Sequence, residues 1–216
     1  MSPEATLKQP FRPASGGTNN HYRYTMIEIR IHGRGGQGAV VASEILANAF
    51  FKDGNSVQTF PEFGVERRGS PVAAYLRVDK KQVLVRCKIY EPDHIIVLDP
   101  TLLNAVDVTV GLKPNGWILV NSNKPPAELG FPDKFRVITV DATALAIKYH
   151  LGPRTSPIVN TAILGAFAVT KLVTLKSIFW AIKAKITISK ENNVKAAEES
   201  FKNVVMSPCE YTGLTK

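Results

Sequence analysis

After an irregular start, the chain shows the alternation of apolar and polar positions that is typical of a half-buried strand. Residues 26–33, MIEIRIHG, alternate in this way and end in glycine, which predicts a first strand. The next residues predict a glycine-rich turn and a helix, which Gly54 is expected to end as a left-handed cap. Residues 56–60 predict a short second strand, and the polar residues 61–71, which contain glycine and proline, predict a loop.

The middle of the chain alternates between strand and helix patterns. Residues 72–78 and 82–89 are rich in β-branched residues and flank a turn-prone aspartate, which predicts a β-hairpin. Further strands are expected at residues 94–100, 117–121 and 136–142, and helical stretches at residues 101–110 and 142–152. The three later strands are almost continuously apolar, as parallel strands covered on both faces are. The sequence therefore predicts an α/β fold, with a doubly wound, mostly parallel sheet and an inserted β-hairpin.

The last third of the chain predicts C-terminal helices at residues 157–173, 175–186 and 189–205. The first of these is strongly apolar and rich in small residues, so it either fills the core of its own domain or contributes to a subunit interface. Residues 1–25, in contrast, are rich in Pro, Gly, Ser, Thr and Asn and lack apolar periodicity. We expect an extended or disordered tail there and a single α/β domain over residues 26–216.

Composition narrows the class of protein. Of the 216 residues, 44% are hydrophobic and 21% are charged, which excludes collagen-like and wholly disordered chains. No apolar run is long enough to span a membrane, and the tail lacks the apolar core of a secretory signal. The formal net charge of +9 fits an acidic partner, such as a phosphorylated small molecule or an acidic protein. The basic residues are not interleaved with aromatic residues, so we do not expect a nucleic-acid partner. The lack of a long apolar run likewise leads us to expect no membrane partner.

The two cysteines, Cys87 and Cys209, exclude several kinds of site. This chain alone cannot supply the four cysteines of an iron–sulfur cluster or of a four-cysteine zinc site. A disulfide framework is excluded as well, so a reducing, cytoplasmic location is expected.

The glycine-rich turn is the candidate ligand site. It matches the pattern G-x-G-x-x-G between a strand and a helix, with Gly33, Arg34, Gly35, Gly36, Gln37 and Gly38 in register. Glycine allows the backbone to approach a phosphate closely, and the helix N-terminus offers free N–H donors. The alternative is that these glycines only allow the strand and the helix to pack closely. An acidic residue for a ribose is not convincing, because Glu62 follows a proline in a loop, and this weakens the case for NAD.

A basic loop follows the second strand and contains Glu66, Arg67 and Arg68. In an open parallel sheet such loops gather at the ligand crevice, so we expect this loop beside the glycine turn. Arg67 and Arg68 can bind phosphate or carboxylate through two hydrogen bonds each, and Glu66 can orient one of them. A solvated turn with an internal Glu–Arg pair is an equally weighted alternative.

Other polar residues favour structural roles. His32 precedes the glycine turn, but a packed or hydrogen-bonded histidine is the favoured interpretation. Asp99 and Asp141 end predicted strands, where capping of the next helix is more common than contact with a ligand. The remaining histidines lack the spacing of metal ligands: His21, His94 and His150. Because no Ser–His–Asp or Cys–His arrangement can be argued, we predict no catalytic residue and no metal site in this chain.

Four separated segments, in order from about residue 27 to residue 205, resemble one enzyme family. They are IRIHGRGGQGAVVASEILANAF, TFPEFGVERRGSPVAAYLRV, YEPDHIIVLDPTLL and VDATALA with PIVNTAILGAFA. They resemble the gamma subunit of pyruvate:ferredoxin oxidoreductase and of its 2-oxoisovalerate relative. The resemblance implies an α/β subunit that is not catalytic alone and that works with alpha, beta and delta subunits in a heterotetramer.

The resemblance also implies the chemistry of the complex. The family enzyme decarboxylates a 2-oxoacid, here most simply pyruvate, with coenzyme A (CoA) to acyl-CoA, CO₂ and reduced ferredoxin, and it can run in reverse as a pyruvate synthase. Thiamine diphosphate with Mg²⁺ and 4Fe–4S clusters belong to the other subunits. The gamma subunit helps to bind CoA, which places Gly33–Gly38 and the segment Glu66, Arg67 and Arg68 at the CoA phosphates. The rival hypotheses are a free-standing NAD(P)-dependent oxidoreductase and an assembly scaffold with an empty turn.

Overall fold

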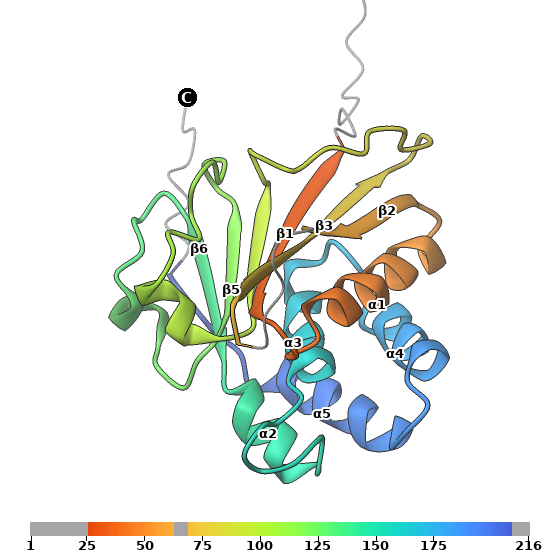
Figure 1. Ribbon diagram of the computed structural model, residues 1–216, viewed down its shortest axis with the longest axis vertical. Helices are drawn as coiled ribbons and strands as arrows, with labels where there is room; N and C mark the ends of the chain where they lie inside the picture. The colour runs from red at the N-terminus through yellow and green to blue at the C-terminus, as the bar shows by residue number, and fades with distance from the viewer. Residues whose placement is uncertain (1–25, 63–68, 209–216) are drawn as a thin grey trace, which may run out of the picture.

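The computed structural model describes residues 26–62 and 69–208 and contains one mixed sheet (Figure 1). The strands are β1 Ile27–Arg34, β2 Ser56–Pro61, β3 Pro71–Asp79, β4 His94–Val97, β5 Trp117–Asn121, β6 Arg136–Val140 and β7 Val205–Met206. They lie in the order β2-β3-β1-β4-β5-β6-β7. Strands β1, β4, β5 and β6 run parallel, whereas β3 is antiparallel to β1 and β2, and β7 is antiparallel to β6.

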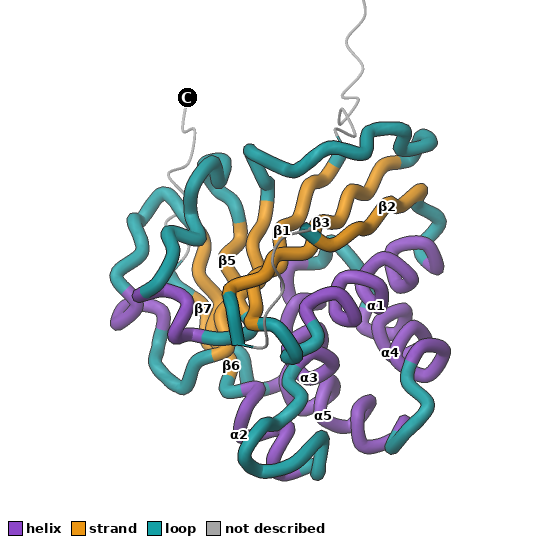
Figure 2. The backbone as a smooth tube through the Cα atoms, viewed as in Figure 1, coloured by secondary structure: helices purple, strands orange, loops and turns teal. Residues whose placement is uncertain are grey.

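The α-helices share one face of this sheet (Figure 2). They are α1 Ala39–Lys52, α2 Ala142–Lys148, α3 Asn160–Phe167, α4 Leu175–Lys185 and α5 Lys190–Lys202, with 3₁₀ helices η1 Pro100–Asn104, η2 Pro126–Leu129 and η3 Ala168–Thr170. The main core joins all five α-helices to side chains such as Ile31, Ile96 and Leu119 on that face. The predicted α/β fold is confirmed. Gly54 follows α1 at φ 81°, as its predicted role as a left-handed cap requires.

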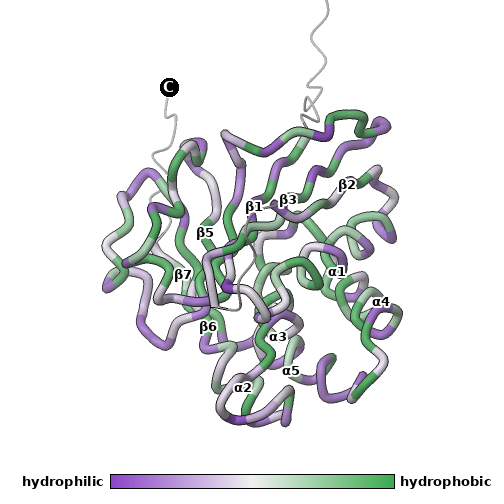
Figure 3. The backbone as a smooth tube through the Cα atoms, in the orientation of Figure 1, coloured by the Kyte–Doolittle hydropathy of each residue, from purple (hydrophilic) through white to green (hydrophobic). Residues whose placement is uncertain are grey.

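The opposite face of the sheet is covered by η1 and loops rather than by long helices. Ile95 and Val97 alternate with Ile96 along β4 and pack against Leu102 of η1 and Val108 of the following loop. Burial on both faces explains why β4, β5 and β6 are almost continuously apolar, and the hydrophobic colour of Figure 3 is prominent along them. The helices therefore lie on one face, and the sheet is not doubly wound in the strict sense.

The predicted β-hairpin over residues 72–78 and 82–89 is wrong in its second strand. Residues 72–78 lie in β3, which pairs with β1 on one side and with β2 on the other, but residues 82–89 form no strand. The buried Arg77 explains the difference, because its Nη1 donates to the carbonyl oxygen of Cys87 at 2.6 Å. Its Nη1 also lies 3.3 Å from the carbonyl oxygen of Val85, so a side chain holds this segment in place of a strand ladder.

The C-terminal third also departs from its pattern in places. The predicted helix 157–173 shortens to α3 and η3, and every residue of α3 is buried. Helix α3 therefore fills the core of its own chain, because a Cβ at Gly165 would lie 1.9 Å from the backbone oxygen of Ala197 in α5. The predicted helix 189–205 ends at Lys202, and after two further residues the chain forms the short edge strand β7. The helical stretch predicted over 101–110 is limited to η1.

The carboxyl ends of the parallel strands β1, β4, β5 and β6 lie at the same end of the sheet (Figure 1). After β1 the chain enters α1 on one face, and after the neighbouring β4 it enters η1 on the other face. Ligands of open α/β sheets bind at such a point, where the connections after two neighbouring strands go to opposite faces of the sheet. This position is the place in the fold where the glycine turn lies.

Candidate ligand site at the glycine turn

The glycine turn joins β1, which ends at Arg34, to α1, which begins at Ala39. Gly36 and Gly38 have φ values of 92° and 80°, in the left-handed region that favours glycine. A Cβ at Gly38 would also lie 2.6 Å from Nδ2 of Asn160, so a side chain at this position meets α3. The glycines thus meet a packing requirement of the fold, and they also leave the backbone open to a close approach.

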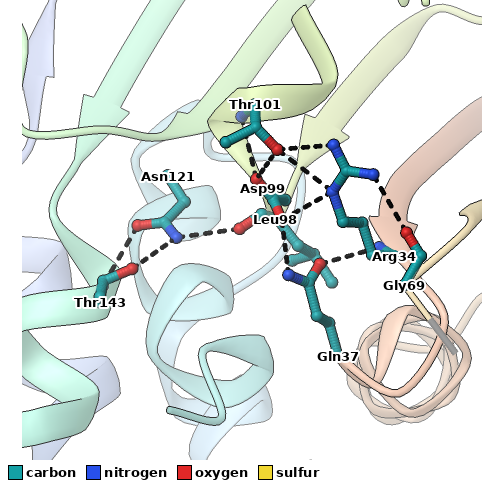
Figure 4. A network of polar contacts seen from close by, with 8 residues as sticks. All are labelled: Arg34, Gln37, Gly69, Leu98, Asp99, Thr101, Asn121 and Thr143. Atoms are coloured by element: carbon teal, nitrogen blue, oxygen red, sulfur yellow. Dashed lines mark hydrogen bonds and ion pairs between the residues drawn. The ribbon is translucent and has the colours of Figure 1, made fainter. Parts of the chain in front are cut away.

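The side chain of Gln37 ties the turn to the end of β4 (Figure 4). Its Oε1 accepts from the backbone N–H of Arg34 at 2.8 Å, and its Nε2 donates to Oδ2 of Asp99 at 2.6 Å. The backbone N–H of Gly35 donates to the carbonyl oxygen of Ser70 at 2.9 Å. The turn is therefore fixed against both neighbouring strands, β3 and β4.

Arg34 is the last residue of β1 at the start of the glycine turn, and its guanidinium is bound within the chain (Figure 4). Its Nε lies 3.2 Å from Oδ2 of Asp99, its Nη2 donates to Oγ1 of Thr101 at 2.7 Å, and its Nη1 donates to the carbonyl oxygen of Gly69 at 3.0 Å. Although burial opposes the effect, hydrogen bonds from Thr101 and Gln37 and the charge of Arg34 lower the pKa of Asp99 below its ordinary value. The geometry favours a positioning role for Arg34 over that of a free cation.

Asp99 and Asp141 cap the helices that follow them, as the sequence predicts. Oδ1 of Asp99 accepts from the backbone N–H of Thr101 at 2.9 Å, and Oδ1 of Asp141 accepts from that of Ala144 at 2.8 Å. Sequence reasoning missed Asn121, whose Nδ2 donates to the carbonyl oxygen of Leu98 at 2.9 Å. Its position directly after four apolar strand residues was the available signal.

The structure describes only part of the basic loop. Glu66, Arg67 and Arg68 lie outside the described residues, so their expected place beside the turn stays a prediction. The described residue that follows this segment, Gly69, donates its backbone N–H to the carbonyl oxygen of Gly35 at 3.1 Å. On the other side, Oε2 of Glu62 accepts from the Tyr75 hydroxyl at 2.7 Å. Glu62 is therefore engaged with β3.

Comparison with known proteins gives the family. Residues 28–203 match the family described as pyruvate ferredoxin/flavodoxin oxidoreductase. The chain belongs to this family. It is 52% identical over 188 residues to the "Pyruvate/ketoisovalerate oxidoreductases common subunit gamma" of Thermococcus kodakarensis, covering 84% of this chain and 98% of the relative. It is 50% identical over 185 residues to the "Pyruvate synthase subunit PorC" of Methanocaldococcus jannaschii, covering 83% and 98%.

Solved structures of the oxidoreductase family agree with this fold. The pyruvate oxidoreductase subunit PORC of Thermotoga maritima matches with a TM-score of 0.71 and 34% identity, over 85% of this chain and 99% of that chain. A 2-oxoglutarate:ferredoxin oxidoreductase from Magnetococcus marinus matches with a TM-score of 0.63 over 81% of this chain and 30% of that chain. At 17% identity the second match shows the fold alone.

Two histidines in this member of the family are structural acceptors. Nε2 of His32 accepts from Nε of Arg30 at 3.0 Å, and Nδ1 of His94 accepts from the backbone N–H of Trp117 at 3.2 Å. Burial lowers the pKa of each to about 4, so both are neutral near pH 7. The structural interpretation of His32 is confirmed. In the described part of the chain, His, Cys, Asp and Glu side chains form no group of three that could hold a metal ion.

Proposed function

We propose that this chain is the gamma subunit of a 2-oxoacid:ferredoxin oxidoreductase, with pyruvate as the simplest substrate. The family match over residues 28–203 carries this proposal, together with relatives matched over 98% of their own length whose names are gamma subunit and PorC. The assembled enzyme would oxidise pyruvate with CoA to acetyl-CoA and CO₂ and pass the electrons to ferredoxin, or run in reverse as a synthase. Residues 26–216 would act as one α/β domain that has no turnover alone.

The role of this subunit within the complex is to hold the phosphates of CoA at the glycine turn. Three observations support it: the connections after the neighbouring strands β1 and β4 go to opposite faces of the sheet at this turn, α1 has no side-chain cap, and its first turn contains no acidic residue. The N–H groups and the positive end of a helix dipole favour an anion there. Arg67 and Arg68 would bind CoA phosphates, Glu66 would orient one of them, and Arg34 and Gln37 would hold the turn in shape.

The cofactors of the enzyme belong to the partner subunits in this proposal. Thiamine diphosphate, Mg²⁺ and 4Fe–4S clusters would lie in the alpha, beta and delta subunits, with ferredoxin as the electron acceptor of the complex. The donor chemistry of this chain does not fit a cluster, because it has two cysteines and Cys87 is exposed beside Arg77, with 3.7 Å between Sγ and Nη2. None of the helices in residues 26–62 and 69–208 is long and apolar enough to cross a membrane. A cytoplasmic location is part of the proposal.

Co-purification followed by an activity assay tests the proposal. The chain is affinity-tagged in its native host, the co-purifying chains are identified, and viologen reduction by pyruvate and CoA is measured. We expect alpha, beta and delta subunits to co-purify and turnover to require CoA. A chain that migrates alone, or that binds NAD(P)H and reduces a 2-oxoacid without partners, would contradict it.

A further inference from the structure

Asn160, the first residue of α3, has an unused hydrogen-bond donor. The residue is 4% exposed, and its Oδ1 accepts from the backbone N–H of Thr161 at 2.8 Å. Within the part of the chain that the structure describes, its Nδ2 donates to no acceptor. Nδ2 is not among the buried side-chain atoms that lack a partner, so this otherwise buried side chain presents its free donor where an acceptor from outside the chain can reach it.

The unused amide faces the glycine turn. Nδ2 of Asn160 lies 2.6 Å from the position that a Cβ of Gly38 would take, and Gly38 directly precedes α1. The start of α3 therefore lies against the start of α1 at the carboxyl edge of the sheet. An acceptor that binds at the glycine turn would come within reach of Nδ2, because Gly38 has no side chain to separate Nδ2 from the backbone of the turn.

The starts of α1 and α3 also share an absence of internal caps. The residue before each helix provides no side-chain cap, and neither helix has an acidic residue in its first turn, although Oδ1 of Asn160 accepts from the N–H of Thr161 at the start of α3. Among the helices of the described residues, η1, α2 and α4 have side-chain caps from the preceding Asp99, Asp141 and Thr174, whereas η2, η3 and α5 also lack one. The amide of Asn160 adds a directed donor to the free N–H groups of these two helix ends.

We propose that Asn160 is a ligand-binding residue whose Nδ2 donates a hydrogen bond to a phosphate oxygen of CoA at the glycine turn. The inference rests on the proposed CoA function and assigns to it a residue of α3, outside the glycine turn and the basic loop. A phosphate fits because it offers only acceptor oxygens and carries negative charge. The diphosphate and the 3′-phosphate of CoA share this chemistry.

Asn160→Asp is the most informative variant. It keeps an oxygen acceptor for the N–H of Thr161, and a carboxylate is favourable at a helix N-terminus, so the fold should tolerate it. It removes the donor and places a negative charge against the phosphate. The matched control is Asn193→Ala, because Asn193 is 6% exposed but fully used: Oδ1 accepts from Oγ1 of Thr161 at 2.6 Å, and Nδ2 donates to the carbonyl oxygen of Ser189 at 3.0 Å.

The test is a steady-state titration of CoA and of dephospho-CoA with the assembled enzyme, with pyruvate saturating and viologen as acceptor. We expect Asn160→Asp and Asn160→Ala to raise the KM for CoA by about tenfold or more, because a hydrogen bond to a charged group is lost. The KM for pyruvate should stay within about twofold in both variants. Asn193→Ala should lower the melting temperature while leaving the KM for CoA unchanged.

Dephospho-CoA distinguishes the two phosphates. A penalty that persists with it assigns Asn160 to the diphosphate, and a penalty that disappears assigns it to the 3′-phosphate. An unchanged KM for CoA in an assembled Asn160→Asp enzyme would overturn this inference alone. A wild-type complex whose turnover does not depend on CoA would instead overturn the proposed function on which the inference rests.

Discussion

Replacement of Gly38 by alanine tests how closely the glycine turn approaches α3. At φ 80° an L-residue occupies the left-handed region, which costs about 1–2 kcal/mol. The new Cβ would lie 2.6 Å from Nδ2 of Asn160, whose side chain is 4% exposed and held through its Oδ1 by the N–H of Thr161, and overpacking of this kind costs about 1–3 kcal/mol. We expect the free energy of unfolding to fall by roughly 2–5 kcal/mol and Tm to fall by roughly 4–20 °C.

Gly54→Ala is the matched control for this change. Gly54 has nearly the same backbone angle, φ 81°, but no atom lies within 4 Å of the position of its Cβ. It shares the backbone strain and lacks the collision, so its Tm should fall by only roughly 2–8 °C. Thermal unfolding of the purified full chain, followed by circular dichroism, measures both variants. Equal losses of Tm in the two variants would refute the reasoning that the turn and Asn160 are in tight contact.

Three further predictions concern ligand binding, pH and cofactor content. Arg67→Ala with Arg68→Ala should raise the KM for CoA of the assembled enzyme by at least about tenfold and leave that for pyruvate unchanged; an unaltered KM for CoA in an intact complex would refute the role of these arginines. The lowered pKa values of His32 and His94 mean that the unfolded chain binds more protons below pH 6.5, so stability should fall as pH falls from 6.5 toward about 4. Urea unfolding at pH 7 and pH 5 measures this loss of stability, which should be roughly 2 kcal/mol per histidine. His94→Asn should make the loss between the two pH values smaller. Equal stability at both pH values would contradict the burial argument. The purified chain alone should contain no stoichiometric iron or thiamine and should not oxidise pyruvate, which metal analysis and a viologen assay check.

The strands of the parallel region could be predicted because burial on both faces produces a strong local signal. Residues 117–121 coincide with β5, and the runs 94–100 and 136–142 contain β4 and β6. Residues 82–89 carry an equally strong strand signal, but β3 already pairs with β1 and β2 on its two edges. Arg77, which holds that segment with its side chain, gives no sign of this role in the sequence.

Only the part of the candidate site that is formed by residues close together in the sequence could be predicted. The motif Gly33–Gly38 indicates a turn between a strand and a helix, and the structure has that turn. The pairing of Arg34 with Asp99 depends on β1 and β4 being neighbours in the sheet. The sequence does not show this, because β2 and β3 lie between β1 and β4 along the chain. Asn160 is far from the turn along the chain, and only the packing of α3 beside α1 brings its amide to Gly38.

Photo-crosslinking of CoA to the assembled enzyme tests most directly the claim that this chain holds CoA at its glycine turn. A CoA analogue with a photoreactive group on the adenosine is bound to the enzyme and irradiated. A parallel sample is irradiated in the presence of excess CoA, which competes with the analogue, and the labelled peptides of both samples are identified by mass spectrometry. The account predicts CoA-protected labelling of this chain in peptides that contain Gly33–Gly38 or Asn160. Protected labelling confined to the other subunits would contradict it.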